Sequence, residues 1–263
     1  MISKYINLII IAAMSVYLSA CTSSSGSSSA GTQVTISVAP SPANVAAMPA
    51  GAKTFTVNGN EIILTKAYLV ISSATIETDC SAMSFRAALD GMLDIVVPVA
   101  NAHTTSTPTS TGEPYVINIL GVDGGLNNIG ALSPPAADYC GVDVDISAAD
   151  ADASNLPDAG AGEPDMIGKT LFIEGTYTPA GGLTGNILMS TGTTLINRNL
   201  LLSALMMISP NNLNGSVKIA INYDTWFDAV DLNILENEVA APTDSSSEGY
   251  KVLQNITNSI HQL

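Results

Sequence analysis

The chain has 263 residues, with 8 Lys and Arg against 23 Asp and Glu, which gives a formal net charge of −15. Binding to a phosphate backbone needs clustered Lys and Arg, so this charge excludes nucleic acid as a partner. Hydrophobic residues make up 46% of the chain, enough to bury a sizeable core.

Residues 1–20 predict an export signal. Lys4 precedes an apolar run at residues 8–18, which is followed by the small residues Ser19 and Ala20. This run is far shorter than the roughly 20 apolar residues that a membrane-spanning helix needs. The segment is therefore interpreted as a cleaved leader and not as a transmembrane anchor.

The end of the leader, Leu18-Ser19-Ala20-Cys21, resembles the bacterial lipobox. The resemblance implies cleavage behind Ala20 and a diacylglycerol on Cys21, so the membrane is expected as a partner through this lipid. Thr22, in place of Asp, favours the outer membrane by the same resemblance. Residues 21–32 are rich in Ser and Gly and are expected to form a flexible lipidated tether.

Residues 33–263 predict a single all-β domain, an antiparallel β-sandwich or jelly-roll-like fold. Short segments rich in Val, Ile, Thr and Tyr alternate with clusters of Gly, Pro, Asn and Asp. Asn58-Gly59 predicts a type I′ hairpin, and the break at residues 72–74 permits the preceding strand to bend. The expected strands are 33–38, 53–57, 61–76, 94–99, 115–120, 139–146, 170–177, 186–190, 194–208 and 216–223.

Two short helices are expected near the end of the chain. The first covers residues 226–235 with Asp224 as its N-cap. The second covers residues 249–263, where apolar residues recur at helical spacing, and it should pack on a sheet edge. Residues 102–113 and 148–164 instead predict long surface loops, which are favoured places for binding sites.

Cys80 and Cys140 are the two cysteines that remain after Cys21 is lipidated. An exported chain meets an oxidising compartment, so they predict a disulfide. The alternative, a metal-binding pair of cysteines, lacks neighbouring ligands in a CxxC or HxxxH pattern.

The sequence contains few of the residues and motifs that common enzymes use for catalysis. The chain has only His103 and His261, and it has no GxSxG elbow, HExxH pair or P-loop. A hydrolase would need paired carboxylates such as Asp228 and Asp231, which sequence alone does not bring together. We therefore expect no catalytic residues and no cofactor. His103 is a weak metal-ligand candidate, with a solvated loop histidine as the alternative.

Residues 138–165 contain eight Asp and Glu residues and no Lys or Arg. Calcium prefers such oxygen ligands, but the spacing of an EF-hand is missing. Asp143 and Asp145 alternate with Val142 and Val144 along an expected strand, which favours a solvated face. No metal residues are assigned to this stretch.

Three segments carry a family resemblance: residues 64–70, the region around Trp226, and the closing residues 253–260. They are similar to exported bacterial lipoproteins and to MbnP-like periplasmic proteins of copper-uptake cassettes. The resemblance implies a copper site near a modified tryptophan, beside a dihaem peroxidase, with Trp226 at the modified position and His103 as a ligand. The histidine-rich pairs of that family are absent here, and the alternative role of Trp226 is to anchor a short helix on the sandwich.

These observations favour an outer-membrane lipoprotein with a non-enzymatic binding or structural domain. Its expected partner is a protein, glycan or ion, held by the long loops. The alternative is a periplasmic metal-handling protein for copper or, with less support, calcium.

Overall fold

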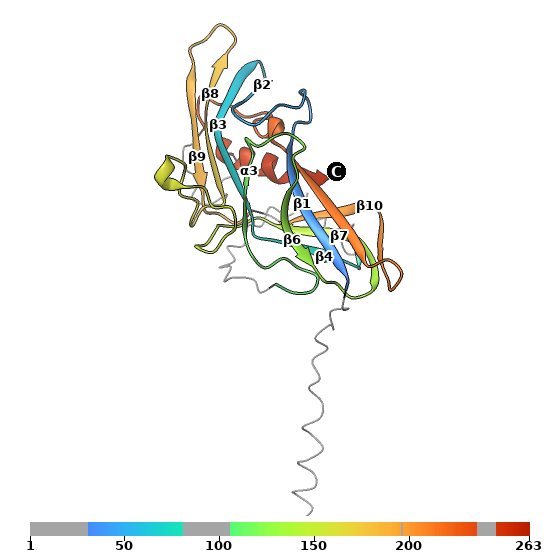
Figure 1. The fold of residues 1–263 in the computed structure, drawn as a ribbon. Coiled ribbons are helices and arrows are strands. Elements are labelled where there is room, and N and C mark those ends of the chain that lie inside the picture. Colours follow the sequence, from blue (N-terminus) through green and yellow to red (C-terminus); the bar gives the residue numbers. More distant parts are fainter. Residues whose placement is uncertain (1–30, 81–105, 196, 236–245) are drawn as a thin grey trace, which may run out of the picture.

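The computed structural model describes residues 31–80, 106–195, 197–235 and 246–263 (Figure 1). Across these residues the protein is an all-β sandwich with one short C-terminal helix, which confirms the predicted fold class. Cys21, His103 and the strand expected at residues 94–99 lie outside the described residues.

The strands form three sheets. Sheet A has the order β12 (Ile260–Gln262), β11 (Asn214–Asn222), β1 (Gln33–Ser41) and β6 (Asn127–Leu132). Sheet B has the order β2 (Lys53–Val57), β3 (Asn60–Ile71), β8 (Leu171–Pro179) and β9 (Gly185–Thr191), and β5 (Tyr115–Asn118) also pairs with β3. Sheet C has the order β10 (Arg198–Ile208), β7 (Ala137–Asp145) and β4 (Ser73–Glu77). The short helices are η1 (Ala159–Ala161), η2 (Tyr223–Thr225) and α3 (Glu248–Asn258).

Two turns form as the sequence predicts. Asn58 and Gly59 have φ angles of 51° and 79°, and the hairpin closes with Val57 opposite Asn60. The break after Ile71 separates β3 in sheet B from β4 in sheet C. A single apolar segment of the sequence therefore supplies strands to two sheets.

One strand pair departs from the expected antiparallel pattern. β1 runs parallel to β11, from Gln33 opposite Asn214 to Ser41 opposite Asn222. Its other neighbour is the antiparallel β6, a strand that the sequence pattern did not predict. Parallel neighbours need a long connection, and here most of the domain lies between the two strands.

The core is continuous across the three sheets and the C-terminal helix. β1 contributes Val34, Ile36 and Val38, all fully buried, because its alternate side chains point into the sandwich. A smaller cluster lies where residues 149–166 cover Tyr68, Val70 and Val116. The second predicted loop, residues 148–164, which we call the acidic loop, therefore packs on the strands of sheet B.

The predicted helix at residues 226–235 is wrong. η2 ends at Thr225, and turns follow it. Asp224 does not cap a helix, because its carboxylate accepts hydrogen bonds from the backbone N–H groups of Ala43 and Asn44, each at 2.7 Å. This carboxylate ties η2 to the segment between β1 and β2.

The predicted C-terminal helix is shorter than expected. Ser247 accepts a hydrogen bond from the backbone N–H of Tyr250 and caps α3, which ends at Asn258. Residues 260–262 form β12 and pair with β11 at the edge of sheet A. The helical spacing correctly placed Val252 and Leu253 in the core.

Candidate functional site

An open groove of about 860 Å³ lies where the first predicted loop meets β6 and the acidic loop. Its lining combines Ser and Thr residues and two carboxylates with apolar residues and glycines. The lining residues are Ser106, Thr107, Pro108, Ser110, Thr111, Gly112, Glu113, Ile129, Gly130, Ala131, Leu132, Ser133 and Asp152.

The loop wall is held by the edge of sheet C. The backbone N–H of Ile76 donates to the carbonyl of Thr109 at 2.9 Å, and the N–H of Thr111 donates to the carbonyl of Ala74 at 3.1 Å. The Thr75 hydroxyl also donates to that of Ser110 at 2.7 Å. Residues 109–111 thus lie along β4 in the manner of a further edge strand, although the sequence predicted only loop here.

The opposite wall is β6, and Gly130 sets how closely the walls approach. A Cβ at Gly130 would lie 2.4 Å from the Cγ2 of Thr111, so a larger residue would push the walls apart. Ala131, the next residue, is exposed within the groove. The sequence pattern did not predict this wall, because Asn127, Asn128 and Gly130 are poor strand formers.

The two predicted loops meet at one end of the groove. The Ser154 hydroxyl donates to Glu113 Oε1 at 2.6 Å, and the Ser154 N–H donates to the carbonyl of Pro114 at 2.8 Å. Asp152 from the same acidic loop reaches the groove wall. The arrangement offers hydrogen-bond donors and acceptors together with negative charge.

Tyr68 of sheet B forms a hydrogen bond with the acidic loop. Its hydroxyl donates to Glu163 Oε2 at 2.9 Å, and the Lys66 ammonium donates to the carbonyl of Gly162 at 2.9 Å. Burial, followed by the hydrogen bond to and the charge of Glu163, raises the pKa of Tyr68 to about 12. This contact holds the loop that contributes Asp152 to the groove.

Tyr68→Phe is expected to lower the free energy of unfolding at neutral pH by about 1 kcal/mol, through loss of one hydrogen bond. A tyrosine in the unfolded chain titrates near pH 10, so the stability from protonated Tyr68 is fully present below about pH 10 and is lost as pH rises through about 12. Urea unfolding at a series of pH values should therefore show a shallower alkaline decline in the variant. If the free energy of unfolding fell with pH equally steeply in wild type and variant, the assigned contact between Tyr68 and Glu163 would be contradicted.

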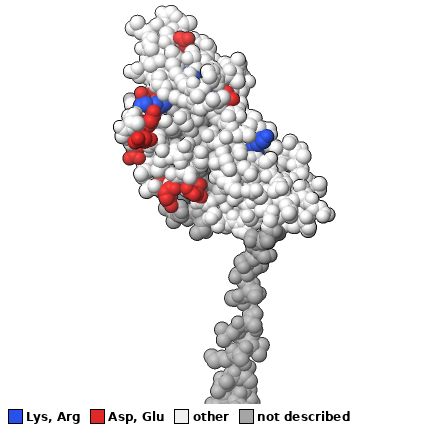
Figure 2. All heavy atoms as spheres, in the orientation of Figure 1, with Lys and Arg blue, Asp and Glu red and all other residues white. Residues whose placement is uncertain are grey.

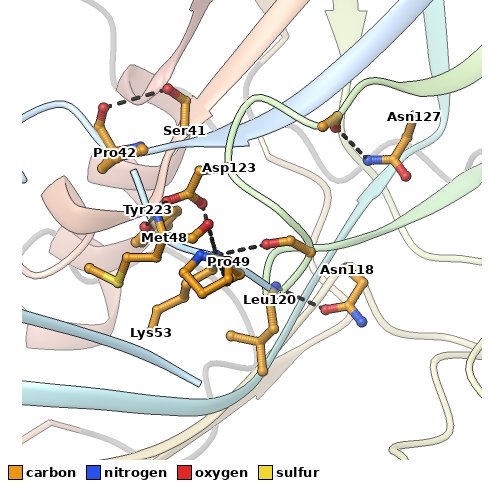
Figure 3. A network of polar contacts seen from close by, with 12 residues as sticks. Ser41, Pro42, Met48, Pro49, Lys53, Asn118, Leu120, Asp123, Asn127 and Tyr223 are labelled. Atoms are coloured by element: carbon orange, nitrogen blue, oxygen red, sulfur yellow. Dashed lines mark hydrogen bonds and ion pairs between the residues drawn. The ribbon is translucent and has the colours of Figure 1, made fainter. Parts of the chain in front are cut away.

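A second polar network lies deep in the molecule, between β2, η2 and the segment after β5 (Figure 3). The Lys53 ammonium donates to Asp123 Oδ1 at 2.9 Å and to the carbonyls of Pro49 and Gly121 at 2.9 and 2.7 Å. Asp123 Oδ2 accepts from the Tyr223 hydroxyl at 2.8 Å. The side chains of Lys53 and Asp123 are 0% and 1% exposed, so this network is structural and no ligand reaches it.

Trp226 is fully buried between η2 and α3. Its indole N–H donates to the Ser259 hydroxyl at 3.1 Å, and its carbonyl accepts from the side chain of Asn255 at 3.1 Å. This is the packing role that the sequence offered as the alternative to a copper-associated tryptophan. With His103 outside the described residues, copper binding stays a prediction, and metal analysis of protein purified without added metal would test it.

Cys80 and Cys140 form the predicted disulfide, with their Cα atoms 6.0 Å apart. Cys140 lies in β7, and Cys80 follows the end of β4. The bond therefore joins two strands that are already paired in sheet C.

The acidic residues of the 138–165 stretch are dispersed over several local roles. Asp158 caps η1, Asp145 accepts from the Ser73 hydroxyl at 2.5 Å, and Asp165 accepts from the N–H of Ile167 at 3.0 Å. Among the residues that the structure describes, no group of three or more His, Cys, Asp or Glu side chains is arranged to hold a metal ion.

Comparisons with protein-family models, with curated proteins and with solved structures found no match. In the described part of the chain, no helix is both long enough and apolar enough to cross a membrane.

Proposed function

We propose that the chain is an outer-membrane lipoprotein whose sandwich is a non-enzymatic binding domain for a hydroxylated ligand of the glycan class. The observation that supports this ligand is the groove in which the two predicted loops meet on a rigid sheet. Its volume of about 860 Å³ lies within the usual range for a small-molecule site.

The lining chemistry supports a neutral, hydroxyl-rich ligand. The exposed hydroxyls of Ser106, Thr107 and Ser133 can donate and accept hydrogen bonds. The carboxylates of Glu113 and Asp152 can accept hydrogen bonds from sugar hydroxyls. The same carboxylates disfavour phosphate and other anions. The exposed Ala131 and the half-buried Pro108 give the wall apolar atoms against which the CH groups of a sugar ring can pack.

The groove is tested by Ala131→Trp in the full-length protein. A library of cell-envelope glycans is screened, and the best ligand is titrated against wild type and variant. Because Ala131 is exposed within the groove, the indole should fill it without disturbing the core and weaken binding about tenfold or more. Asn186→Trp on β9 is the matched control, since this residue is exposed outside the groove. Failure of every glycan to bind wild type, or equal binding by Ala131→Trp, would refute the ligand class.

The anchor is tested by Cys21→Ser. Because the thiol of Cys21 is the expected acylation site, the variant should lose labelling by radioactive palmitate and should not be cleaved behind Ala20. Membrane fractionation of wild type should place the protein in the outer membrane. A variant that is processed normally and released as a mature form would end the lipoprotein proposal.

A further inference from the structure

Exposed apolar side chains gather on one edge strand and the turn that follows it. Leu201, Leu205 and Met207 of β10 are 51%, 60% and 58% exposed, and Leu213, which precedes β11, is 37% exposed. We call these four residues the β10 tip. A cluster of this kind in a water-soluble domain marks an interaction surface.

The pairing of β10 with β7 is interrupted within the β10 tip. Leu201 lies opposite Gly141 and Met206 lies opposite Tyr139, so residues 202–205 bulge out of the ladder. Beyond the bulge, Ile208 is buried, while Met207 faces solvent. Within the bulge, Leu205 is exposed to solvent, while Leu202 packs against the core.

The described chain begins beside this surface. The backbone N–H of Gln33 donates to the carbonyl of Leu213 at 2.8 Å, and a Cβ on Gly31 would lie 3.8 Å from the Leu213 side chain. In Figure 1 the start of β1 and the turn between β10 and β11 lie at the same end of the molecule. A lipid on Cys21 would therefore be tethered next to the β10 tip.

The segments that form the β10 tip and its neighbours in the sequence carry few charges. Residues 31–52, 125–137 and 199–217 contain no Asp, Glu, Lys or Arg, although the chain as a whole has a charge of −15. Figure 2 shows acidic atoms mainly along the left of the visible face and none over the lobe at the lower right, where Figure 1 places β10, although a basic group lies at the upper margin of this lobe. The acidic residues nearest to it are the exposed Asp138, opposite Met207 in the β7–β10 ladder, and the half-buried Glu77, which pairs with Gly141, the partner of Leu201.

We propose that the β10 tip docks on the lipid surface of the membrane that holds the anchor. The inference rests on the proposed lipidation of Cys21. About ten tether residues give a root-mean-square span of roughly 18 Å, which keeps the domain at a high effective concentration near the bilayer. Apolar side chains at such an interface enter the boundary between headgroups and acyl chains, and a surface with few charges limits repulsion from anionic headgroups.

The test uses the full-length lipidated protein in nanodiscs of phosphatidylethanolamine and phosphatidylglycerol. Leu205→Cys and Leu213→Cys each introduce a thiol for an environment-sensitive fluorophore. The control is Leu183→Cys, because Leu183 is 92% exposed in the turn between β8 and β9, at the opposite end in Figure 1. Spin-labelled lipid should quench the fluorophore several-fold more at positions 205 and 213 than at position 183. Asp138→Asn should increase the quenching at position 205.

The possible outcomes distinguish failure of the docking proposal from failure of the lipid-anchor proposal. Protein that does not co-purify with nanodiscs would refute the lipid anchor itself. Protein that co-purifies but shows equal quenching at all three positions would refute docking while leaving the anchor in place. Fluorescence changes that depend on protein concentration and persist without lipid would mean that a second copy of the chain covers the β10 tip, and would overturn the proposal.

Discussion

Lys53→Met is expected to lower the free energy of unfolding by about 3–5 kcal/mol, because it leaves the buried carboxylate of Asp123 without its cation. The two side chains are 0% and 1% exposed, so water cannot replace the ammonium. The carboxylate keeps hydrogen bonds from the Met48 N–H and the Tyr223 hydroxyl, which do not compensate its charge. Urea unfolding, followed by circular dichroism, measures the effect.

Lys66→Met is the matched control for that variant. Lys66 pairs with Glu174 at 3.3 Å, but the side chains are 28% and 42% exposed, so the loss should stay below about 1 kcal/mol. Adding Asp123→Asn to Lys53→Met should recover part of the lost stability, since the buried charge is then removed. Equal destabilisation by Lys53→Met and Lys66→Met would contradict the assignment of a buried ion pair.

Replacing both Cys80 and Cys140 by Ser is expected to lower the free energy of unfolding by about 4 kcal/mol. The disulfide closes a loop of 60 residues, and restricting the unfolded chain by such a loop accounts for this magnitude in the chain-entropy description. Unfolding with and without reductant measures it. Reductant should destabilise the wild type to the level of the double variant and leave that variant unchanged.

Mass spectrometry provides an independent check of the disulfide. Alkylation of the unreduced mature protein should label neither Cys80 nor Cys140, and alkylation after reduction should label both. Labelling of both thiols in the unreduced native protein would show that the bond is absent and would restore the metal-binding alternative.

The position of Lys53 shows what a local pattern can and cannot predict. In β2, Lys53 alternates with Phe55 and Val57 on the buried face, while Thr54 and Thr56 are exposed. The alternation therefore places a lysine inside the protein. It cannot identify Asp123 as the partner, because that residue is 70 positions away and is brought close by the tertiary fold.

Asp224 and β6 illustrate the same limit. An Asp before an apolar stretch is typical of a helix N-cap. In the folded chain, however, the Asp224 carboxylate accepts hydrogen bonds from the backbone N–H groups of residues 43 and 44. β6 has weak strand propensity, and it forms because its backbone pairs with that of β1. The hairpin at Asn58 was predictable, since its signal is contained in adjacent residues.

The candidate groove was predictable only in its parts. The composition of residues 102–113 and 148–164 indicated loops, and both contribute to it. Their meeting through Ser154 and Glu113 joins residues 41 positions apart, and the β6 wall comes from a strand that the pattern did not show. The sequence thus indicated segments suited to binding, and the tertiary fold decided which of them meet.

The position of β1 determines how the domain would resist a pulling force. β1 is an inner strand of sheet A, with β11 running parallel to it on one side and β6 antiparallel on the other. A force applied at residue 31 acts along the strand axis, so it loads the hydrogen bonds of both ladders together, in shear. Detaching the first strand would require many of these bonds to break at once and not one after another. This resistance would serve the lipid anchor that we propose at Cys21.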